Sequence, residues 1–199
     1  MVNFLENDCT FYVLDKQTLE SCGKFCCDHE DLDDFFNNES FLYSDELLGK
    51  SYCFRLNDNP EQIVCAFTVS NSSIRISDLP SNRKAKIRSK IPHEKHSNSF
   101  PAVLIGRLGI NSEFKGKKIG SALMDFIKAW FIDPHNKTGC RFIIVDAYNE
   151  EIPLSYYTKN GFQYMFSSEK QESEYTHKNA STPLNTRLMY FDLIVLKPD

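Results

Sequence analysis

The sequence predicts a mixed α/β fold in which helices cover a β-sheet. Two segments rich in β-forming residues, 52–56 and 63–69, flank a turn-forming Asn-Asp-Asn-Pro sequence, which predicts a hairpin. An almost unbroken apolar run at 102–110 leads through a polar stretch into an amphipathic helical pattern. Another long apolar run lies at 187–196. The chain has 199 residues, a length typical of one domain, so we expect residues 1–199 to form a single domain.

The first half of the chain predicts short strands around one acidic helix. We expect a short strand at 11–14, a helix at 32–47, and a continuation of the second hairpin strand at 72–77. Residues 78–99 are polar and basic and include two prolines. They predict a long basic loop with one helical turn at most.

The second half alternates more regularly between strands and helices. Apolar residues at helical spacing predict a helix at 121–131, which Asp133-Pro134 ends. A buried strand is expected at 141–147, then a short helix at 153–159 with Gly161 in the position that favours a positive φ angle. The remaining segments predict a strand at 162–166, a polar loop at 167–183 and a last strand at 187–196.

Charge is distributed unevenly, although the net charge is only −4. Eight acids and no Lys or Arg lie between Asp28 and Glu46. Six bases lie close together in the predicted loop, at positions 83, 84, 86, 88, 90 and 95. A run of like charges usually forms a solvent-exposed surface, and this is the ordinary interpretation of both runs. The basic run is also the one that could bind a phosphate-bearing partner.

Composition excludes several classes of protein. No apolar run approaches the ~20 residues that cross a bilayer, and the N-terminus does not resemble a secretory signal. Seven cysteines, an odd number, indicate reduced thiols and a cytoplasmic protein. Cys22, Cys26 and Cys27 lack a second Cys or His pair at zinc spacing, so we expect no metal.

The segment Lys115-Gly-Lys-Lys-Ile-Gly-Ser121 connects the strand at 102–110 to the following helix. The N-terminus of a helix presents backbone N–H groups and a partial positive charge, and glycines let the backbone approach an anion. This arrangement suits a pyrophosphate. The spacing matches neither a Walker A loop nor a dinucleotide-binding glycine motif, and an ordinary lysine-rich turn is the alternative.

The stretch from Ile105 to Met124 resembles motif A of the GNAT acetyltransferases, in which [Q/R]-x-x-G-x-[G/A] lies between a strand and a helix. Lys115 stands where that family has Gln or Arg, and Lys118 stands where it has the middle Gly. Val145-Asp-Ala-Tyr-Asn149 followed by Tyr156-Tyr-Thr-Lys-Asn-Gly-Phe162 resembles the family's motif B. Together the two motifs cover roughly residues 102–165.

The resemblance implies a GNAT fold, with a central twisted mixed sheet of about six or seven strands, and acetyl transfer from acetyl-CoA to a primary amine by direct attack. Asn149 would contact the cofactor, and Tyr157, with Tyr156 as the fallback, would protonate the leaving thiolate. A backbone N–H near the end of the strand would polarise the thioester carbonyl. The other implied cofactor-binding residues are Leu108, Gly109, Ile110, Lys115, Gly116, Lys117, Lys118, Ile119, Gly120 and Ser121. No general base stands out, although Glu113 and Asp146 are near in sequence.

A further likeness bears on the acceptor amine. Phe25-Cys-Cys-Asp-His-Glu-Asp-Leu-Asp-Asp-Phe35 and Pro101-Ala-Val-Leu-Ile-Gly-Arg-Leu-Gly-Ile110 resemble segments of the GNAT-type toxins that acetylate aminoacyl-tRNA. The basic run could then meet tRNA phosphates, whereas the acidity of the 28–46 segment favours a small-molecule, peptide or protein amine. An antitoxin protein and a second copy of the chain are further candidate partners. The alternative from another class is an acyl-CoA-binding sensor with little turnover.

Overall fold

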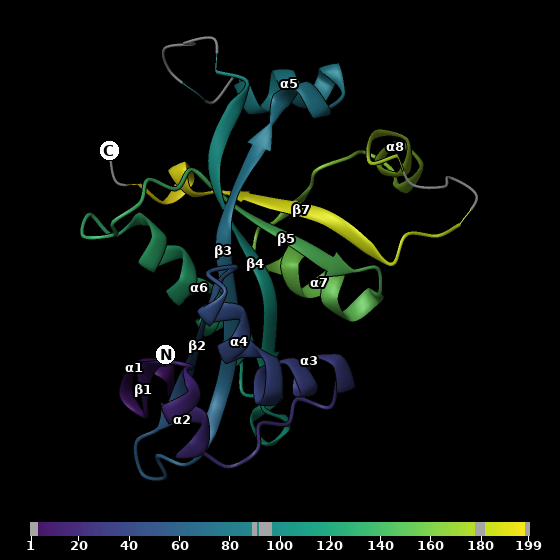
Figure 1. Ribbon diagram of the computed structural model, residues 1–199. Coiled ribbons are helices and arrows are strands. Elements are labelled where there is room, and N and C mark those ends of the chain that lie inside the picture. Colours follow the sequence, from purple (N-terminus) through teal and green to yellow (C-terminus); the bar gives the residue numbers. More distant parts are fainter. Residues whose placement is uncertain (1–3, 89–90, 92–96, 178–181, 198–199) are drawn as a thin grey trace. The chain divides into compact units, whose positions relative to one another are not determined.

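The computed structural model describes residues 4–88, 91, 97–177 and 182–197, and its elements can be followed in Figure 1. Seven strands form one mixed sheet, as the sequence predicts. Their order in the sheet is β1-β2-β3-β4-β5-β7-β6. The strands are β1 (Cys9–Val13), β2 (Lys50–Leu56), β3 (Ile63–Arg75), β4 (Ser99–Ile110), β5 (Phe142–Tyr148), β6 (Gln163–Tyr164) and β7 (Thr186–Asp192). The α-helices are α1 (Phe4–Asn7), α2 (Lys16–Glu20), α3 (Glu30–Asp34), α4 (Ser40–Asp45), α5 (Ser81–Arg88), α6 (Ile119–Ile132), α7 (Glu151–Lys159) and α8 (Glu169–Tyr175).

The chain divides into two compact units, and β3 and β4 run through both. The first unit comprises the described residues up to Asn71 together with Ile105–Phe131. The second comprises the described residues of 72–104 and 132–199. The expectation of a single domain over the whole chain stays a prediction.

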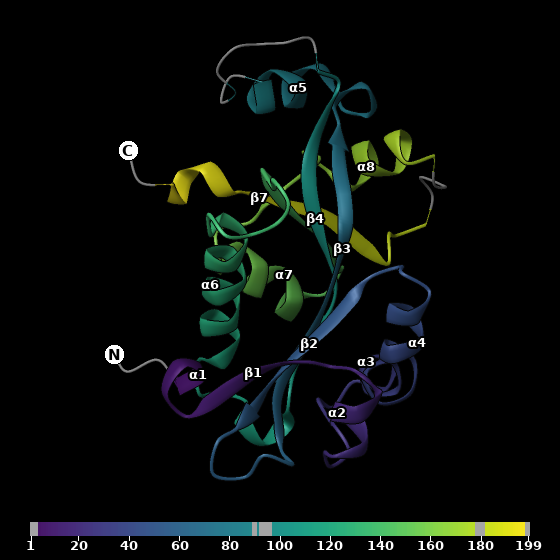
Figure 2. The ribbon, with the colours of Figure 1, turned by 60° about the vertical axis from the view of Figure 1, so that its left-hand side comes forward.

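Helix α6 and the strands β1, β2 and β3 are labelled in Figure 2. An aromatic cluster packs this helix onto the strands of the first unit. β1, β2 and β3 are antiparallel neighbours, which confirms the predicted hairpin. The Phe126 ring lies 4.9 Å from both Phe11 and Phe54, centroid to centroid. Trp130 meets Tyr52 edge-on at 4.8 Å. These contacts use the apolar face that the sequence predicts for this helix, and they fix the helix whose N-terminus follows the candidate cofactor loop.

The predicted helix at 32–47 consists of α3, a π-helical turn over Phe35–Glu39, and α4. Asn37 lies in the π-helical turn, and its side-chain amide donates to the Asp33 carbonyl four residues earlier. This bond takes the acceptor that a regular α-helical turn would give to a backbone N–H. The same side chain also accepts from the Phe25 N–H at 2.9 Å and donates to the Phe25 carbonyl at 2.8 Å. The widened turn therefore fastens Phe25 to the helix.

The C-terminus of α4 is closed by a Schellman motif with leucine in the position that glycine usually takes. The Leu48 N–H bonds to the Tyr43 carbonyl at 3.1 Å, and the Leu47 N–H bonds to the Ser44 carbonyl at 3.0 Å. Leu47 has a φ of 58°. A left-handed conformation is unfavourable for a residue with a β-carbon, so the cap forms at a cost in backbone strain.

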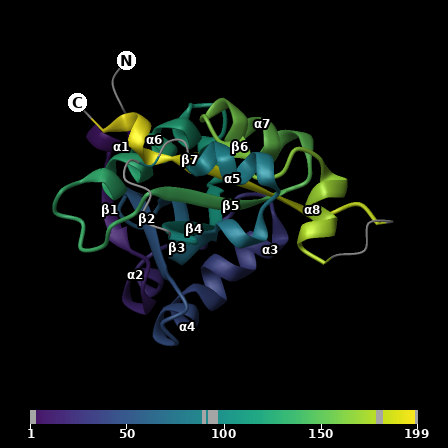
Figure 3. The same ribbon diagram turned by 90° about the horizontal axis from the view of Figure 1, so that it is seen from above.

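In the second unit, β7 lies between β5 and β6 and is antiparallel to both (Figure 3). The Arg141 guanidinium forms a bidentate bond with the Asp192 carboxylate, with N···O distances of 2.7 and 3.2 Å, and joins β5 to the end of β7. The apolar core of this unit includes Ile87 of α5 together with Phe142 and Ile144 of β5.

Four expectations in the second unit need correction, the last of which concerns helix α8. Residues 81–88 form helix α5, with two full turns, instead of a loop with one turn at most; its buried Ile87 anchors it to the core. Lys90 and Lys95 of the basic run lie outside the described residues. The last strand ends at Asp192, and a 3-10 turn over Leu193–Leu196 follows. The strand expected at 162–166 is reduced to the two residues of β6.

The predicted polar loop at 167–183 contains helix α8. Ser168 caps it, because its hydroxyl accepts from the Gln171 N–H at 3.2 Å. Its inward residues are polar: Glu172 is 3% exposed, pairs with the Arg187 guanidinium at 2.7 Å and accepts from the Leu188 N–H. Because an ion pair anchors α8, this helix needs no apolar stripe, and hydrophobic periodicity in the sequence does not reveal it.

We predict that Leu47→Gly stabilises the protein. Glycine adopts a positive φ without the steric cost that a leucine meets there, and Leu47 is 89% exposed, so little packing is lost. The free energy of unfolding should rise by up to about 1 kcal/mol after allowing for the greater freedom of glycine in the unfolded chain. Urea unfolding followed by circular dichroism measures this. A loss of stability would mean that the Leu47 side chain supports the cap.

Candidate active site

The end of β4 is held by Asn111, a buried residue that follows the strand. Its backbone N–H donates to the Val64 carbonyl and its side-chain amide donates to the Ile63 carbonyl, both at 2.9 Å. Its side-chain oxygen accepts from the Glu113 N–H at 3.1 Å and so caps the short 3-10 turn over Ser112–Phe114. One side chain thus ends the strand and starts the candidate cofactor loop. Sequence patterns do not reveal this role, because Ile63 and Val64 lie far from Asn111 along the chain.

The loop from Lys115 to Lys118 is exposed, and it adopts two left-handed conformations. Gly116 has a φ of 79° and Lys118 a φ of 61°. Lys118 therefore has a backbone conformation suited to glycine, at the position where the resembling motif has glycine. Phe114, buried just before it, anchors the loop, whereas a β-carbon on Gly116 would meet nothing within 4 Å.

Helix α6 begins at Ile119, directly after this loop. The Ala122 N–H donates to the Lys118 carbonyl at 3.2 Å. The amides of the first turn precede it, and they lie at the positive end of a helix of 14 residues. Ile119 is buried and Ser121 is exposed. An exposed, glycine-like backbone joined to this helix end is suited to an anion such as a diphosphate.

The lysines of the loop differ in their surroundings. The Lys115 ammonium lies 2.9 Å from the Asp28 carboxylate, and both side chains are at least half exposed. The Lys117 ammonium lies 4.9 Å from the centre of the Phe114 ring. Asp28 itself has a φ of 61°, which aspartate tolerates better than most residues. One of the three expected positive charges thus already faces a carboxylate.

The strand positions Leu108, Gly109 and Ile110 are expected to face the thioester, and the structure adds a packing role for the glycine. A β-carbon on Gly109 would lie 3.1 Å from the Phe25 ring and 3.3 Å from the Cys27 sulfur. Phe25 is 1% exposed, so the ring could not move away without loss of packing. The segment that begins at Phe25 therefore lies directly against the end of β4.

Asn149 and Tyr157 belong to the second unit, whereas Leu108 to Ser121 belong to the first. The Asn149 N–H donates to the Asn185 carbonyl at 2.9 Å. Its side-chain nitrogen donates to the Leu184 carbonyl at 2.8 Å and to the Glu169 carboxylate at 3.3 Å. The side-chain nitrogen of Asn149 therefore binds the segment that precedes β7. A cofactor contact by Asn149 stays a prediction.

Tyr157 lies on α7, whose C-terminus is closed by a second Schellman motif. The Phe162 N–H bonds to the Tyr157 carbonyl and the Gly161 N–H to the Thr158 carbonyl, both at 3.0 Å. Gly161 has the predicted positive φ, 83°. The half-buried Tyr157 ring contacts Phe162 at 5.3 Å and Tyr156 at 5.0 Å. Burial raises the pKa of Tyr157 above that of a free phenol, so it keeps its proton at neutral pH.

Thiol chemistry has little support in this site. Burial, together with a hydrogen bond to Asp33, raises the pKa of Cys27 to about 12. Burial raises the pKa of Cys140 to about 11. Thiolates are the reactive form, so neither sulfur is a ready nucleophile at neutral pH. Within residues 4–88, 91, 97–177 and 182–197, no group of three or more His, Cys, Asp or Glu side chains is arranged to hold a metal ion.

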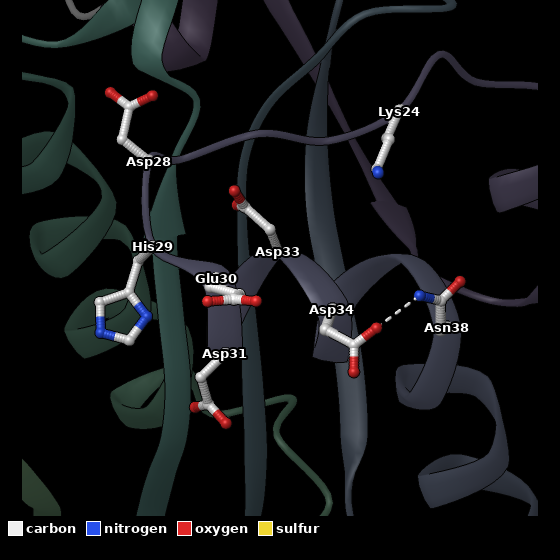
Figure 4. A pocket seen from close by; sticks show the side chains of 8 residues that line it. All are labelled: Lys24, Asp28, His29, Glu30, Asp31, Asp33, Asp34 and Asn38. Atoms are coloured by element: carbon white, nitrogen blue, oxygen red, sulfur yellow. Dashed lines mark hydrogen bonds between the residues drawn. The ribbon is translucent and has the colours of Figure 1, made fainter.

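A surface pocket lies over α3 (Figure 4). Its lining consists of Lys24, Asp28, His29, Glu30, Asp31, Asp33, Asp34 and Asn38. Five aspartate or glutamate carboxylates and only one lysine line it, so the pocket would repel a diphosphate. We therefore do not place the cofactor in it.

No family model and no curated protein matches this sequence. Solved structures do match its fold along nearly its whole length. AtaT complexed with acetyl-methionyl-tRNAfMet has a TM-score of 0.66 and 19% identity, covering 95% of this chain and 97% of that one. A tyrosine-to-phenylalanine mutant of KacT has a TM-score of 0.66 and 18% identity, covering 96% and 98%. A tyrosine-to-phenylalanine mutant of the toxin AtaT, bound to the C-terminus of the antitoxin AtaR and acetyl-CoA, has a TM-score of 0.60 and 17% identity, covering 96% of each.

These likenesses establish the fold. The chain has the GNAT fold that motifs A and B predict, a mixed α+β fold built on a seven-stranded sheet. Among the proteins with this fold, it is similar to the toxin AtaT and to KacT.

We predict opposite effects on stability from two substitutions in the loop. Lys118→Gly should raise the free energy of unfolding by up to about 1 kcal/mol, because it removes a β-carbon from a left-handed residue. Gly116→Ala should lower it by about 1 kcal/mol, because it adds one, although open space surrounds the position. Thermal and urea unfolding of both variants measure this. Changes of the same sign would contradict the positive φ angles of Gly116 and Lys118.

Proposed function

We propose that this chain is a cytoplasmic N-acetyltransferase that transfers the acetyl group of acetyl-CoA to a primary amine by direct attack. The observation that carries the proposal is the exposed loop before α6, in which Lys118 adopts the conformation of the glycine it replaces. The fold shared with AtaT, which was solved with acetyl-CoA, supports it. The free cysteines support a reducing compartment. Among the described helices, none is long and apolar enough to cross a membrane.

The residues of the loop fit a diphosphate. In the proposed site, the backbone of Gly116 to Ser121 and the lysines hold the diphosphate of CoA, with the α6 N-terminus adding a positive potential. Bound acetyl-CoA would supply an acetyl group activated as a thioester. An N–H of Leu108, Gly109 or Ile110 donates to the thioester carbonyl and stabilises the negative charge that grows there. A neutral amine forms the new C–N bond as the C–S bond breaks.

Tyr157 is the proposed proton donor. When the C–S bond breaks, the sulfur leaves as a thiolate, and the phenol transfers its proton to it. The raised pKa of Tyr157 keeps this proton in place at the pH where the reaction would run. The amine loses its own proton to solvent, because neither Glu113 nor Asp146, both exposed, has a surrounding that marks it as a base.

We predict that Tyr157→Phe lowers kcat by about a hundredfold or more and changes the dissociation constant of CoA by less than about twofold. Acetyl transfer followed by mass spectrometry gives the rate, and calorimetry with CoA gives the affinity. Tyr156→Phe is the matched control. Unchanged rates in both variants would mean that neither phenol donates the proton, and loss in Tyr156→Phe alone would move the role to Tyr156. CoA binding without acetyl transfer by the wild-type chain would favour an acyl-CoA sensor.

The pH profile gives an independent test of the same assignment. A general acid loses activity as the pH rises through its pKa, and the pKa of Tyr157 is raised. Any alkaline loss of kcat due to this group should therefore begin only above pH ~10. An alkaline limb with a midpoint below pH ~9 that disappears in Tyr157→Phe would contradict the raised pKa.

The acceptor with a specific observation in its favour is the α-amine of aminoacyl-tRNA, which would make the protein a toxin with an antitoxin partner. Helix α5 places Lys84, Lys86 and Arg88 within two turns, and the fold is similar to AtaT, solved with acetyl-methionyl-tRNAfMet and with the antitoxin AtaR. The acidic pocket over α3 favours a small-molecule, peptide or protein amine instead. A second copy of the chain remains a further candidate partner.

We predict that tRNA binding, if this acceptor is correct, depends on α5. Replacing Lys84, Lys86 and Arg88 by Gln should weaken binding and lower the slope of log K against log salt by about 2. The control replaces the exposed Lys16, Lys24 and Lys50 of the first unit by Gln. It removes the same number of positive charges, but from the other unit. Filter binding over a salt series measures both. Absence of binding at low salt would exclude this acceptor and leave the general proposal standing.

A further inference from the structure

Three exposed leucines, one in α4 and two directly after it, are called the leucine patch. Leu42 is 50% exposed, Leu47 89% and Leu48 52%. The opposite side of the same helix is fixed to the core of the first unit, where Ser40 is fully buried and the Tyr43 ring packs edge-on against Phe35 at 5.9 Å. The helix is thus firmly anchored, while its apolar outer face has no partner in the part of the chain that the structure describes.

The conformation of Leu47 makes the patch unusual. Its side chain is almost entirely in solvent, and its backbone is left-handed, with a φ of 58°. Glycine would relieve the strain, and a polar residue would remove the exposed apolar surface. Leucine therefore serves neither the cap nor the core of this unit. Strain combined with apolar exposure is a feature of functional positions.

The charges around the patch determine what can dock there. Glu39, Asp45 and Glu46 are exposed, and none of them forms an ion pair within the described residues. No Lys or Arg occurs from residue 25 to residue 49. The same helical segment begins with the carboxylates of α3 (Figure 4). An apolar surface with an acidic rim is complementary to a segment that is both apolar and basic.

We propose that the leucine patch docks a basic, amphipathic segment of another protein. Leucine side chains of the partner bury Leu42, Leu47 and Leu48, and its lysines or arginines meet the carboxylates of Glu39, Asp45 and Glu46. This interaction goes beyond acetyl transfer and does not depend on it, because the patch includes none of the residues assigned to the cofactor or to proton transfer.

The test uses the full chain and a fluorescein-labelled helical peptide of about 18 residues, with leucine on one face and lysine on the rest. Fluorescence anisotropy at low salt gives the dissociation constant. Leu47→Gly should weaken binding about tenfold, and because it should not destabilise the fold, the loss would report on the surface itself. Asp45→Asn with Glu46→Gln should weaken binding severalfold and reduce its dependence on salt.

The controls separate this surface from charge attraction in general. Val195→Ser removes another exposed apolar side chain, 58% exposed and in the second unit, and should leave affinity unchanged. A peptide with serine for leucine, and one with glutamate for lysine, should each bind at least about tenfold more weakly. Equal binding by Leu47→Gly, or by the serine peptide, would overturn the proposal. So would sedimentation showing a dimer of the wild-type chain that Leu47→Gly dissociates, because the occupant would then be a second copy.

Discussion

The geometry of the candidate site depends on where β4 ends, and the Asn111 carboxamide fixes that point. It donates to the Ile63 carbonyl of β3 and accepts from the Glu113 N–H, while its backbone bonds to Val64. A buried amide with several partners has few alternative arrangements. The position of the 3-10 turn, and hence of the loop before α6, follows from these bonds. Asn111 would therefore influence how a ligand binds to this loop without contacting the ligand itself.

The segment Phe25–Asp28 joins the acidic helix to the same strand end. Asn37 clamps the Phe25 backbone, the Phe25 ring lies against Gly109, and the Ser112 N–H donates to the Cys26 carbonyl at 2.9 Å. The Asp28 carboxylate then faces Lys115. The loop is therefore less positive than its three lysines imply. A diphosphate bound there would rely more on backbone amides and the α6 N-terminus than on side-chain charge.

The sequence revealed the elements that bury apolar residues and missed those that do not. The strands and α6 follow from apolar runs and helical spacing, and the aromatic contacts of Phe126 and Trp130 confirm the predicted face. Helices α5 and α8 escaped detection because one buries a single apolar side chain and the other is anchored through Glu172. The order of motifs A and B predicts where the site lies along the chain, and that assignment stays a prediction. The bonds of Asn37, Asn111 and Asn149 were beyond prediction, because their partners lie far away in the sequence or on the backbone.

The π-helical turn at Phe35–Glu39 also constrains how this chain can vary. It accommodates one more residue than a regular α-helical turn by widening locally, so the helix after it keeps the direction of its side chains. Loss of one residue here would therefore restore α-helical geometry and leave Ser40 and Tyr43 facing the core. The effect would fall instead on the bonds that Asn37 makes to Phe25, because a regular turn gives the Asp33 carbonyl to a backbone N–H. A deletion at this turn should thus disturb the end of β4, where the Phe25 ring lies against Gly109, more than it disturbs α4 itself.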